Sequence, residues 1–356
     1  MKVKSIRLEN FMLFDALDIE WSSGINIISG GNSTGKTTLI KALYSILKPI
    51  VEINNQNVPI DNKIESAVVQ KLLGCFRPEG MKIGRLVSRQ RGNNACASLV
   101  VNTDMGSSIS AQFSNRQDKH ITLSTQNFTL AFGEPVYIPP KEMISATEHF
   151  QSLYEDYHID FEEMYYDLTK LLSRPLKKGA ASSQQRYVMQ SFEKILNGRI
   201  MQQDKKFFLQ LKGKGRFEMG LLSEGYRKLA TIIYLIQSGS LDENTVLFWD
   251  EPETNMNPKM IPYLSDAIMK LAETGVQVFI TTHDYFVQQA FNMYNAYPHK
   301  LNKEEIDIKF ISLYHNAEDK VVYEAAETVS ELEHNPIMEE FNNIYNRELE
   351  YINGDH

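Results

Sequence analysis

The sequence GGNSTGKTT, residues Gly30–Thr38, decides the fold that we expect for this chain. It follows the short apolar stretch GINIIS and precedes TLIKALYSILK, whose apolar residues recur at helical spacing. The segment fits the pattern G-x-x-x-x-G-K-[ST], in which the glycines let backbone amides approach phosphate groups. A strand, a glycine-rich loop and a helix N-terminus in this order predict a phosphate-binding loop.

Chemistry assigns roles to single residues of this loop. The Lys36 ammonium would meet the β- and γ-phosphates of a nucleoside triphosphate, and the Thr37 hydroxyl would bind Mg²⁺. We therefore expect a nucleoside triphosphate and Mg²⁺ as ligands. The loop residues that we expect to bind nucleotide are Gly30, Gly31, Asn32, Ser33, Thr34, Gly35, Lys36, Thr37 and Thr38.

Two later apolar stretches end in ionisable side chains. The strand in TVLFWDEPE ends at Asp250 and Glu251, and the strand in VFITTHD ends beside His283. Acids can simply solvate a strand end, and a lone histidine is usually structural. Beside a phosphate-binding loop we instead expect Asp250 in the Mg²⁺ shell and Glu251 as the general base for an attacking water. We expect His283 to sense the γ-phosphate.

The stretch LLSEGYRKLATIIYLI, residues 221–236, predicts an amphipathic helix with an unusual start. Ser223 can cap the helix, and Glu224 suits the positive end of its dipole. Gly225 is unexpected, because a glycine in the first helical turn costs ~1 kcal/mol relative to alanine. We expect Ser223 and Gly225 to have a function that offsets this cost.

Composition limits the class of protein. The chain has 356 residues, of which 42% are hydrophobic and 23% charged, enough for a large core. Its net charge of −8 argues against an overall basic nucleic-acid binder but leaves a local basic groove open. No signal peptide or long apolar run is present, so we expect a cytoplasmic protein without a membrane partner. Cys75 and Cys96 lack metal-ligand spacing, and we expect two buried structural thiols.

Strands that alternate with helices predict an α/β fold around a mixed central sheet. The stretches VKSIRLENF and ALDIEW predict a hairpin, and ASLVVN, SISAQF, HITLST and FTLAF predict an antiparallel sheet that PVYIPP ends. We expect one lobe at residues 1–142, a helical insertion at 143–200 and a second lobe at 201–356 with a C-terminal helix. The stretch RPLKKGAASS is the best candidate for a mobile linker.

These motifs, in this order, resemble the set found in ABC-type ATPases. LSEGY at 222–226 is similar to the family signature, usually written L-S-G-G-Q. In that family the signature closes on the γ-phosphate held by a second subunit, so that two ATPs lie between head-to-tail protomers. The resemblance implies a P-loop NTPase fold, ATP as the nucleotide and a homodimer or higher homo-oligomer. It also explains Gly225, because a side chain there would keep the partner's phosphate away from the helix N-terminus.

Within ABC proteins the chain resembles the SMC, RecF and OLD (overcoming lysogenisation defect) branch. IRLENFMLF, LSEGYRKLA, WDEPETNMNP and TTHDYF carry this resemblance over nearly the whole chain. It makes ETNMNP the D-loop, with Asn257 where a histidine is common. No secure Q-loop glutamine is present, and Glu142 is a weak substitute. The stretch between Glu142 and Ser223 is too short for the coiled-coil arm of SMC proteins, even as a helical hairpin.

PVYIPPKEMIS, YYDLTKLLSRPLKKG and VLFWDEPE also resemble the ATPase subunits of bacterial phage-defence operons of the PARIS and Septu type. In OLD proteins a Toprim nuclease follows the ATPase. Only about 70 residues follow His283 here, without a D-x-D metal motif. We therefore expect a separate effector protein, a nuclease or a toxin.

Three functions follow from these resemblances. The first is a cytosolic ATPase whose nucleotide-driven dimerisation controls an effector or sensor in antiphage defence. The second is a DNA-repair clamp of the RecF kind, and the third, which we rank lowest, is a transporter subunit. DNA contact is left open for a basic hairpin, although such lysines more often form a solvated face. These residues are Lys205, Lys206, Lys212, Lys214 and Arg216. We expect the C-terminal helix to dock on the body.

Overall fold

A six-stranded mixed sheet forms the centre of the computed structural model, which describes residues 1–54, 62–89, 95–126, 133–177, 183–203, 206–302 and 304–353. The strand order is β14-β13-β3-β12-β11-β7, with only the β13–β14 pair antiparallel. The strands are β3 (Ile25–Gly30), β7 (Val136–Ile138), β11 (Val246–Asp250), β12 (Gln277–Thr281), β13 (Ile308–His315) and β14 (Val321–Ala326).

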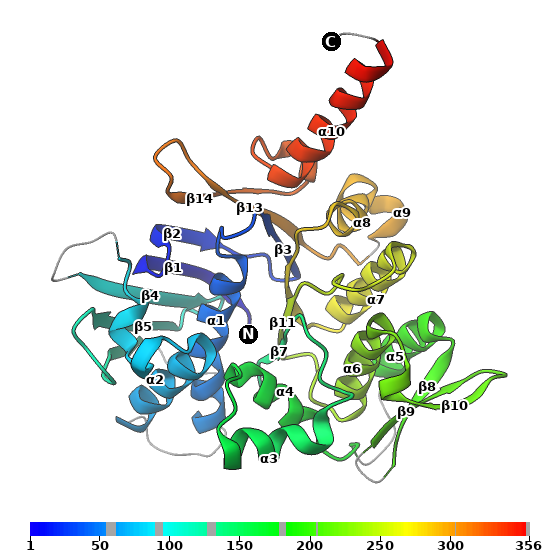
Figure 1. The fold of residues 1–356 in the computed structure, drawn as a ribbon, viewed down its shortest axis with the longest axis horizontal. Coiled ribbons are helices and arrows are strands. Elements are labelled where there is room, and N and C mark those ends of the chain that lie inside the picture. Colours follow the sequence, from blue (N-terminus) through cyan, green and yellow to red (C-terminus); the bar gives the residue numbers. More distant parts are fainter. Residues whose placement is uncertain are drawn as a thin grey trace.

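Both faces of the six-stranded sheet are covered, so β3, β11 and β12 are buried along their whole length. Successive side chains point into different cores: Phe248 packs with the first lobe and Trp249 with the helices of the second. One face packs against α1 (Lys36–Asn54) and α2 (Asn62–Phe76), and the other against the helices of the second lobe (Figure 1). These second-lobe helices are α6 (Glu224–Gln237), α7 (Ile261–Glu273) and α8 (Tyr285–Ala296); the short α9 (Pro298–Leu301) follows α8 and has no buried residue.

A five-stranded antiparallel sheet covers the outer side of α1 and α2, in the order β2-β1-β4-β5-β6. The predicted hairpin and the next strands are confirmed, whereas FTLAF lies outside the described residues. PVYIPP does not end this sheet, because its strand β7 pairs with β11 in the central sheet. The strands are β1 (Val3–Phe11), β2 (Phe14–Glu20), β4 (Cys96–Thr103), β5 (Ser108–Ser114) and β6 (Thr122–Gln126).

The expected insertion at 143–200 contains helices, and a small sheet starts at its end and continues past residue 200. Its helices are α3 (Thr147–Tyr157), α4 (Glu163–Leu172) and α5 (Ser183–Leu196). The sheet β10-β9-β8 follows, from β8 (Gly198–Gln203), β9 (Lys206–Leu211) and β10 (Gly215–Glu218). The segment before the signature is therefore not a helical hairpin alone. Residues 178–182 of the expected linker lie outside the described residues.

The C-terminal helix α10 (Pro336–Asn353) projects from the body (Figure 1), so the prediction of a docked flank is wrong for most of its length. Its first turns are held by a stack of Phe341 on Tyr285, with ring centroids 4.7 Å apart, and by the Asn335–Gln288 hydrogen bond of 2.7 Å. Beyond them the apolar side chains Ile344, Tyr345, Leu349, Tyr351 and Ile352 are exposed.

The expectation for the two cysteines is half right. Both are free thiols; Cys75 is buried and Cys96 is exposed. Burial raises the pKa of the Cys75 thiol to about 12, so this group stays protonated. None of the helices in the described part of the chain is long and apolar enough to cross a membrane.

Candidate nucleotide site

The phosphate-binding loop connects β3 to α1, and two of its glycines are required by the fold. Gly30 has φ 147°, and a Cβ there would lie 2.3 Å from the Leu313 carbonyl oxygen. Gly35 has φ 91°, and a Cβ there would lie 2.5 Å from the Phe14 ring. Both contacts are too close for any side chain, so only glycine allows this path of the loop.

The Lys36 side chain lies over the loop itself. Its Nζ donates to the carbonyl oxygens of Gly30, at 2.9 Å, and Gly31, at 2.8 Å. Burial lowers the pKa of Lys36, although the nearby acids Glu251, Asp250 and Glu253 oppose the shift. Thr34 closes the turn by donating to the Gly31 carbonyl at 2.9 Å. Asn32 and Ser33 are exposed, whereas Thr38 is partly buried.

Asp250 lies at the end of β11, which is separated from β3 by β12. Its carboxylate accepts hydrogen bonds from hydroxyl groups of three elements. Thr37 of α1 donates to its Oδ1 at 2.9 Å, Thr281 of β12 donates to the same oxygen, and Tyr137 of β7 donates to Oδ2 at 3.0 Å. Burial raises the pKa of Asp250, and these hydrogen bonds limit the rise.

This set of oxygens fits a divalent cation. The buried Asp250 carboxylate has hydroxyl partners but no ion pair within the described residues, and Mg²⁺ prefers carboxylate and hydroxyl oxygens. The Thr37 and Asp250 oxygens that the sequence assigns to the metal are therefore adjacent. They are the residues that would hold Mg²⁺ beside a nucleotide.

Glu251 and His283 also meet, although they are separated by a strand and a helix in the sequence. The His283 Nδ1 lies 3.2 Å from the Glu251 Oε1, at the same edge of the sheet as the phosphate-binding loop. Glu251 has φ 48°, a conformation that side chains rarely adopt and that is concentrated at functional sites. The two side chains are 27% and 51% exposed, so solvent reaches both of them.

Several residues of this edge were not predicted from the sequence. Thr281 and Tyr137 hold Asp250, and Glu253 accepts a hydrogen bond from Thr282 at 2.6 Å. Burial raises the pKa of Glu253, whose Oε2 has no hydrogen-bond partner among the residues that the structure describes. The available signal was the position of polar residues at the ends of strands, in YIPP and ITTHD, but it does not say which of them face the loop.

The signature segment, residues 222–226, makes fewer hydrogen bonds through its side chains than the phosphate-binding loop does. Ser223 occupies the N-cap position of α6, but the predicted capping bond is wrong, because its side chain makes none. Ser223 is exposed, and Gly225 is buried against Met256 of the D-loop, where a Cβ would lie 3.4 Å from the methionine Cγ. The chain's own packing thus favours a small residue here without excluding alanine.

Two consecutive basic residues of α6 connect the signature to both flanking loops. The Arg227 Nη1 lies 2.9 Å from the Glu142 carboxylate, so the weak Q-loop substitute is paired with the signature helix. The buried Lys228 Nζ donates to the carbonyl oxygens of Glu251, at 3.1 Å, and Thr254, at 2.9 Å. Lys228 therefore supports the backbone that carries Glu251. A lysine on a helix gives no sequence signal for such a role.

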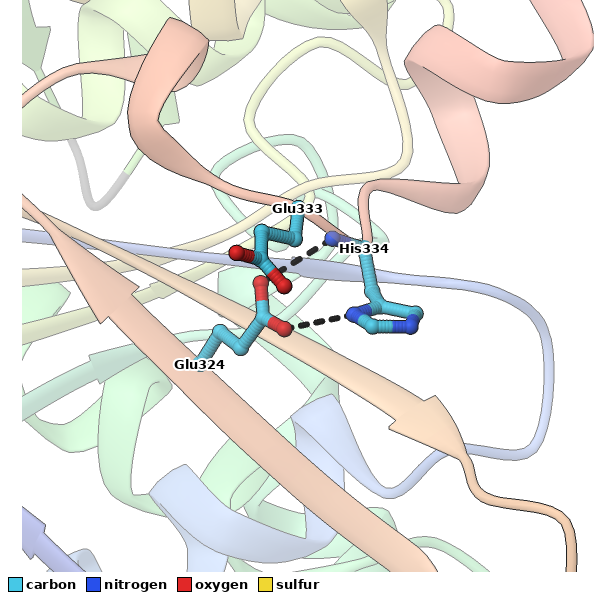
Figure 2. Close-up of side chains that lie close together, drawn as sticks. All are labelled: Glu324, Glu333 and His334. Atoms are coloured by element: carbon cyan, nitrogen blue, oxygen red, sulfur yellow. Dashed lines mark hydrogen bonds and ion pairs between the residues drawn. The ribbon is translucent and has the colours of Figure 1, made fainter.

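A separate group of ionisable residues joins β14 to the start of α10 (Figure 2). The Glu324 carboxylate accepts the His334 Nδ1–H at 2.5 Å and the His334 backbone N–H at 3.0 Å. The imidazole also stacks on Tyr314, with ring centroids 4.4 Å apart. Glu333 lies alongside, but both oxygens of Glu324 are bonded to His334, so we interpret the group as a structural link.

Comparisons with known proteins agree with this geometry. The family model described as "AAA domain, putative AbiEii toxin, Type IV TA system" matches residues 111–287, and "AAA ATPase domain" matches residues 1–76. The Old nuclease of Escherichia phage P2 is 35% identical over 74 residues, which are 19% of this chain and 13% of that protein. The DNA replication and repair protein RecF of Agathobacter rectalis is 46% identical over 44 residues, or 12% of each protein.

The chain thus spans a small part of the length of the curated relatives that it matches, whereas solved structures match along nearly their whole length. The SMC head domain from Thermotoga maritima has a TM-score of 0.51 and 12% identity, with 92% of this chain and 99% of that chain covered. An SMC head bound to the C-winged helix domain of ScpA has a TM-score of 0.58 and 13% identity, with 93% and 100% covered.

The likeness to SMC heads shows that the fold is the α/β fold of P-loop NTPases with mixed sheets, as predicted. The two family models describe ATPase or AAA domains and match residues 1–76 and 111–287. The segments similar to the Old nuclease and to RecF are 74 and 44 residues long. The chain is therefore similar to AAA ATPase domains, to RecF and to the Old nuclease in separate segments, and to SMC heads in its fold.

Proposed function

We propose that this chain binds and hydrolyses ATP in a head-to-tail dimer of two copies and that this cycle regulates a separate effector in antiphage defence. The observation that carries the dimer is the separation of two parts of one site. Within the described residues, no hydrogen bond or ion pair joins the signature segment 222–226 to the loop 30–38. The exposed Ser223 and the amides at the start of α6 remain available for a phosphate outside the chain.

In the proposed reaction the loop residues bind the phosphates and Lys36 moves from the loop carbonyls to the β- and γ-phosphates. Thr37 and Asp250 would hold Mg²⁺, which would neutralise negative charge on the phosphates. Glu251 accepts the proton of the water that attacks the γ-phosphorus, while the bond to the β–γ bridging oxygen breaks. The His283 imidazole, 3.2 Å from Glu251, holds this carboxylate and donates toward the γ-phosphate.

We keep three units as a proposed organisation: residues 1–142, 143–200 and 201–356. The central sheet takes strands from the first and the third of them, so these two lobes are expected to fold together. The polar edge of the sheet belongs to both lobes for the same reason.

The antiphage role is supported by two kinds of similarity. One is the family model whose description includes a type IV toxin–antitoxin system, and the other is the segment shared with the Old nuclease of a phage. The test is the plating efficiency of phages on cells that carry the gene with its genomic neighbours, compared with cells carrying Glu251→Gln. Protection that is equal in both strains, or absent in both, would contradict an ATP-driven defence function.

The dimer is tested on the purified chain by light scattering. Glu251→Gln with ATP and Mg²⁺ should have twice the mass of the same protein with ADP, because the proposed base is absent and the closed state accumulates. The matched control is Lys36→Ala, which should keep one mass under both conditions. A Glu251→Gln protein that binds ATP without a change of mass would contradict the sandwich.

A further inference from the structure

A cavity of about 710 Å³ lies between α5, the start of α6 and α7, away from the phosphate-binding loop. Its walls combine two kinds of side chain, which come from all three elements and from the turn after the D-loop. They are the aromatic residues Tyr187, Tyr226 and Tyr263 and the cations Lys194, Lys259 and Lys270.

Helical spacing aligns these groups on facing surfaces. Tyr187 and Lys194 lie two turns apart on α5, and Tyr263 and Lys270 lie two turns apart on α7. The Lys270 Nζ bridges the helices, because it donates to Ser191 of α5 at 3.0 Å and lies 4.9 Å from the centre of the Tyr187 ring. Lys270 therefore joins two walls of the cavity and lies beside the Tyr187 ring.

The cavity is positive in a protein whose net charge is −8. Against the three lysines it contains a single carboxylate, Asp266, which already accepts the Tyr294 hydroxyl. Lys194 and Lys259 are exposed and have no ion pair in the described part of the chain. The exposed rings of Tyr187 and Tyr263 beside such cations match a ligand that has flat rings and negative charge.

A second cavity of about 600 Å³ continues from the first and shares Gln190 and Lys194 with it. It extends along the end of α5 to the exposed Lys212 and to the exposed Arg199, whose Nε lies 4.0 Å from the Glu193 carboxylate in the same cavity. The cations thus follow a path that crosses both cavities. Of the hairpin lysines that are candidates for DNA contact, Lys212 lies on this path and Lys205 lies outside the described residues.

The geometry points to a site for nucleotide units, in which tyrosines stack on the bases and lysines contact the phosphates. The same chemistry is present in a free nucleotide and in single-stranded nucleic acid, and the continuous path of cations favours the strand. This site is separate from the proposed ATP site. Tyr226 of the signature and Lys259 after the D-loop line it, so a bound strand would touch both segments that the dimer uses.

The test is fluorescence anisotropy with a labelled single-stranded 12-mer, using the full chain without added ATP. Tyr187→Ala should weaken binding about 5- to 100-fold, as expected for one lost stacking contact. Lys194→Glu should weaken binding. It should also reduce the slope of the logarithm of the binding constant against the logarithm of the salt concentration by about one. The control is Lys119→Glu, an equal charge change at an exposed position of the antiparallel lobe, which should bind as the wild type does.

Two further probes test the stacking and the source of the ligand. An abasic 12-mer keeps the phosphates without the bases and should bind weakly, with no difference between wild type and Tyr187→Ala. Competition by a mononucleotide, measured in the Lys36→Ala background, identifies a free nucleotide as the ligand, and competition by the strand alone identifies nucleic acid. The site is overturned if neither competes, if the abasic strand binds equally well, or if Lys194→Glu behaves like Lys119→Glu.

Discussion

The phosphate-binding loop and the signature segment differ in how far their polar groups are satisfied within the chain. Lys36, Thr37 and Asp250 bond to one another or to the loop, and the glycines beside them allow no other residue. Ser223 is exposed without a capping bond, and Gly225 leaves room for a Cβ. One region is organised by its own fold, whereas the other leaves the Ser223 side chain exposed, as the proposed contact with a second copy requires.

The largest expected effect is at the phosphate-binding loop and its neighbour Glu251, where ATP turnover and ATP affinity should respond differently to one substitution. Glu251→Gln keeps the size of the side chain but removes the proton acceptor, so ATP turnover should fall ~10²–10⁴-fold. ATP affinity, measured by calorimetry, should remain close to wild type. Turnover at the wild-type rate would remove Glu251 from the role of base.

Gly225→Asp tests the other region. The carboxylate would meet the γ-phosphate held by a second copy, and like charges in a partly dry interface cost several kcal/mol, so ATP should no longer close the dimer. Gly225→Ala is the matched control, because its Cβ would lie 3.4 Å from Met256, at ordinary contact distance. It should keep part of the ATP-dependent change of mass.

A mixture of Gly225→Asp with Lys36→Ala sharpens this comparison. Both defects can fall on one composite site, which leaves an intact loop facing an intact signature at the other. Hydrolysis should therefore partly return on mixing if the two sites act independently. A Gly225→Asp protein that has lost ATP binding as a monomer would place the glycine in its own chain's pocket and contradict the difference between the two regions.

Lys36→Ala should affect binding as well as turnover. The ammonium is replaced by a methyl group, and a hydrogen bond to a charged group contributes about 1.5–3 kcal/mol, so ATP affinity should fall roughly 10- to 100-fold. Equilibrium binding of a fluorescent ATP analogue measures the change. Unchanged affinity would show that the loop does not bind the nucleotide.

Lys228→Met tests the connection between the two regions. The substitution keeps an unbranched buried side chain but removes the donor to the Glu251 and Thr254 carbonyl oxygens. Because these bonds hold the backbone of Glu251, we expect turnover to fall about tenfold, the value of roughly one such bond, with little change in KM for ATP. Thermal melting should accompany the assay, because a fall in kcat that follows lost stability would make Lys228 structural only.

The smallest expected effect lies outside both regions, at the link between β14 and α10. The hydrogen bond to Glu324 raises the pKa of His334 above its ordinary value. The pair therefore stabilises the fold fully below the unfolded pKa of about 6.5, and this contribution is lost as pH rises through the higher folded pKa. The difference in Tm between wild type and His334→Gln should shrink over that interval. A difference that is constant with pH would contradict the ion pair.

The sequence predicts the fold most accurately where a motif and its flanking elements lie in one continuous piece of chain. The strand, loop and helix at residues 24–48 are of this kind, because the glycine spacing fixes the loop and the apolar pattern fixes its neighbours. Prediction failed for PVYIPP and for the C-terminal helix. A three-residue strand does not specify its partner, and an amphipathic pattern does not reveal whether the body provides a surface for it.

The sequence by itself determined the phosphate-binding loop, the strand-end acids and the signature helix, because each depends on residue types at short fixed spacing. Only the tertiary structure decided that Tyr137 and Thr281 hold Asp250, that Lys228 supports Glu251, and that tyrosines and lysines of α5 and α7 line one cavity. The physical reason is distance along the chain. These contacts join residues between 23 and 113 positions apart, or side chains on separate helices, and the packing of the sheet and helices brings them together.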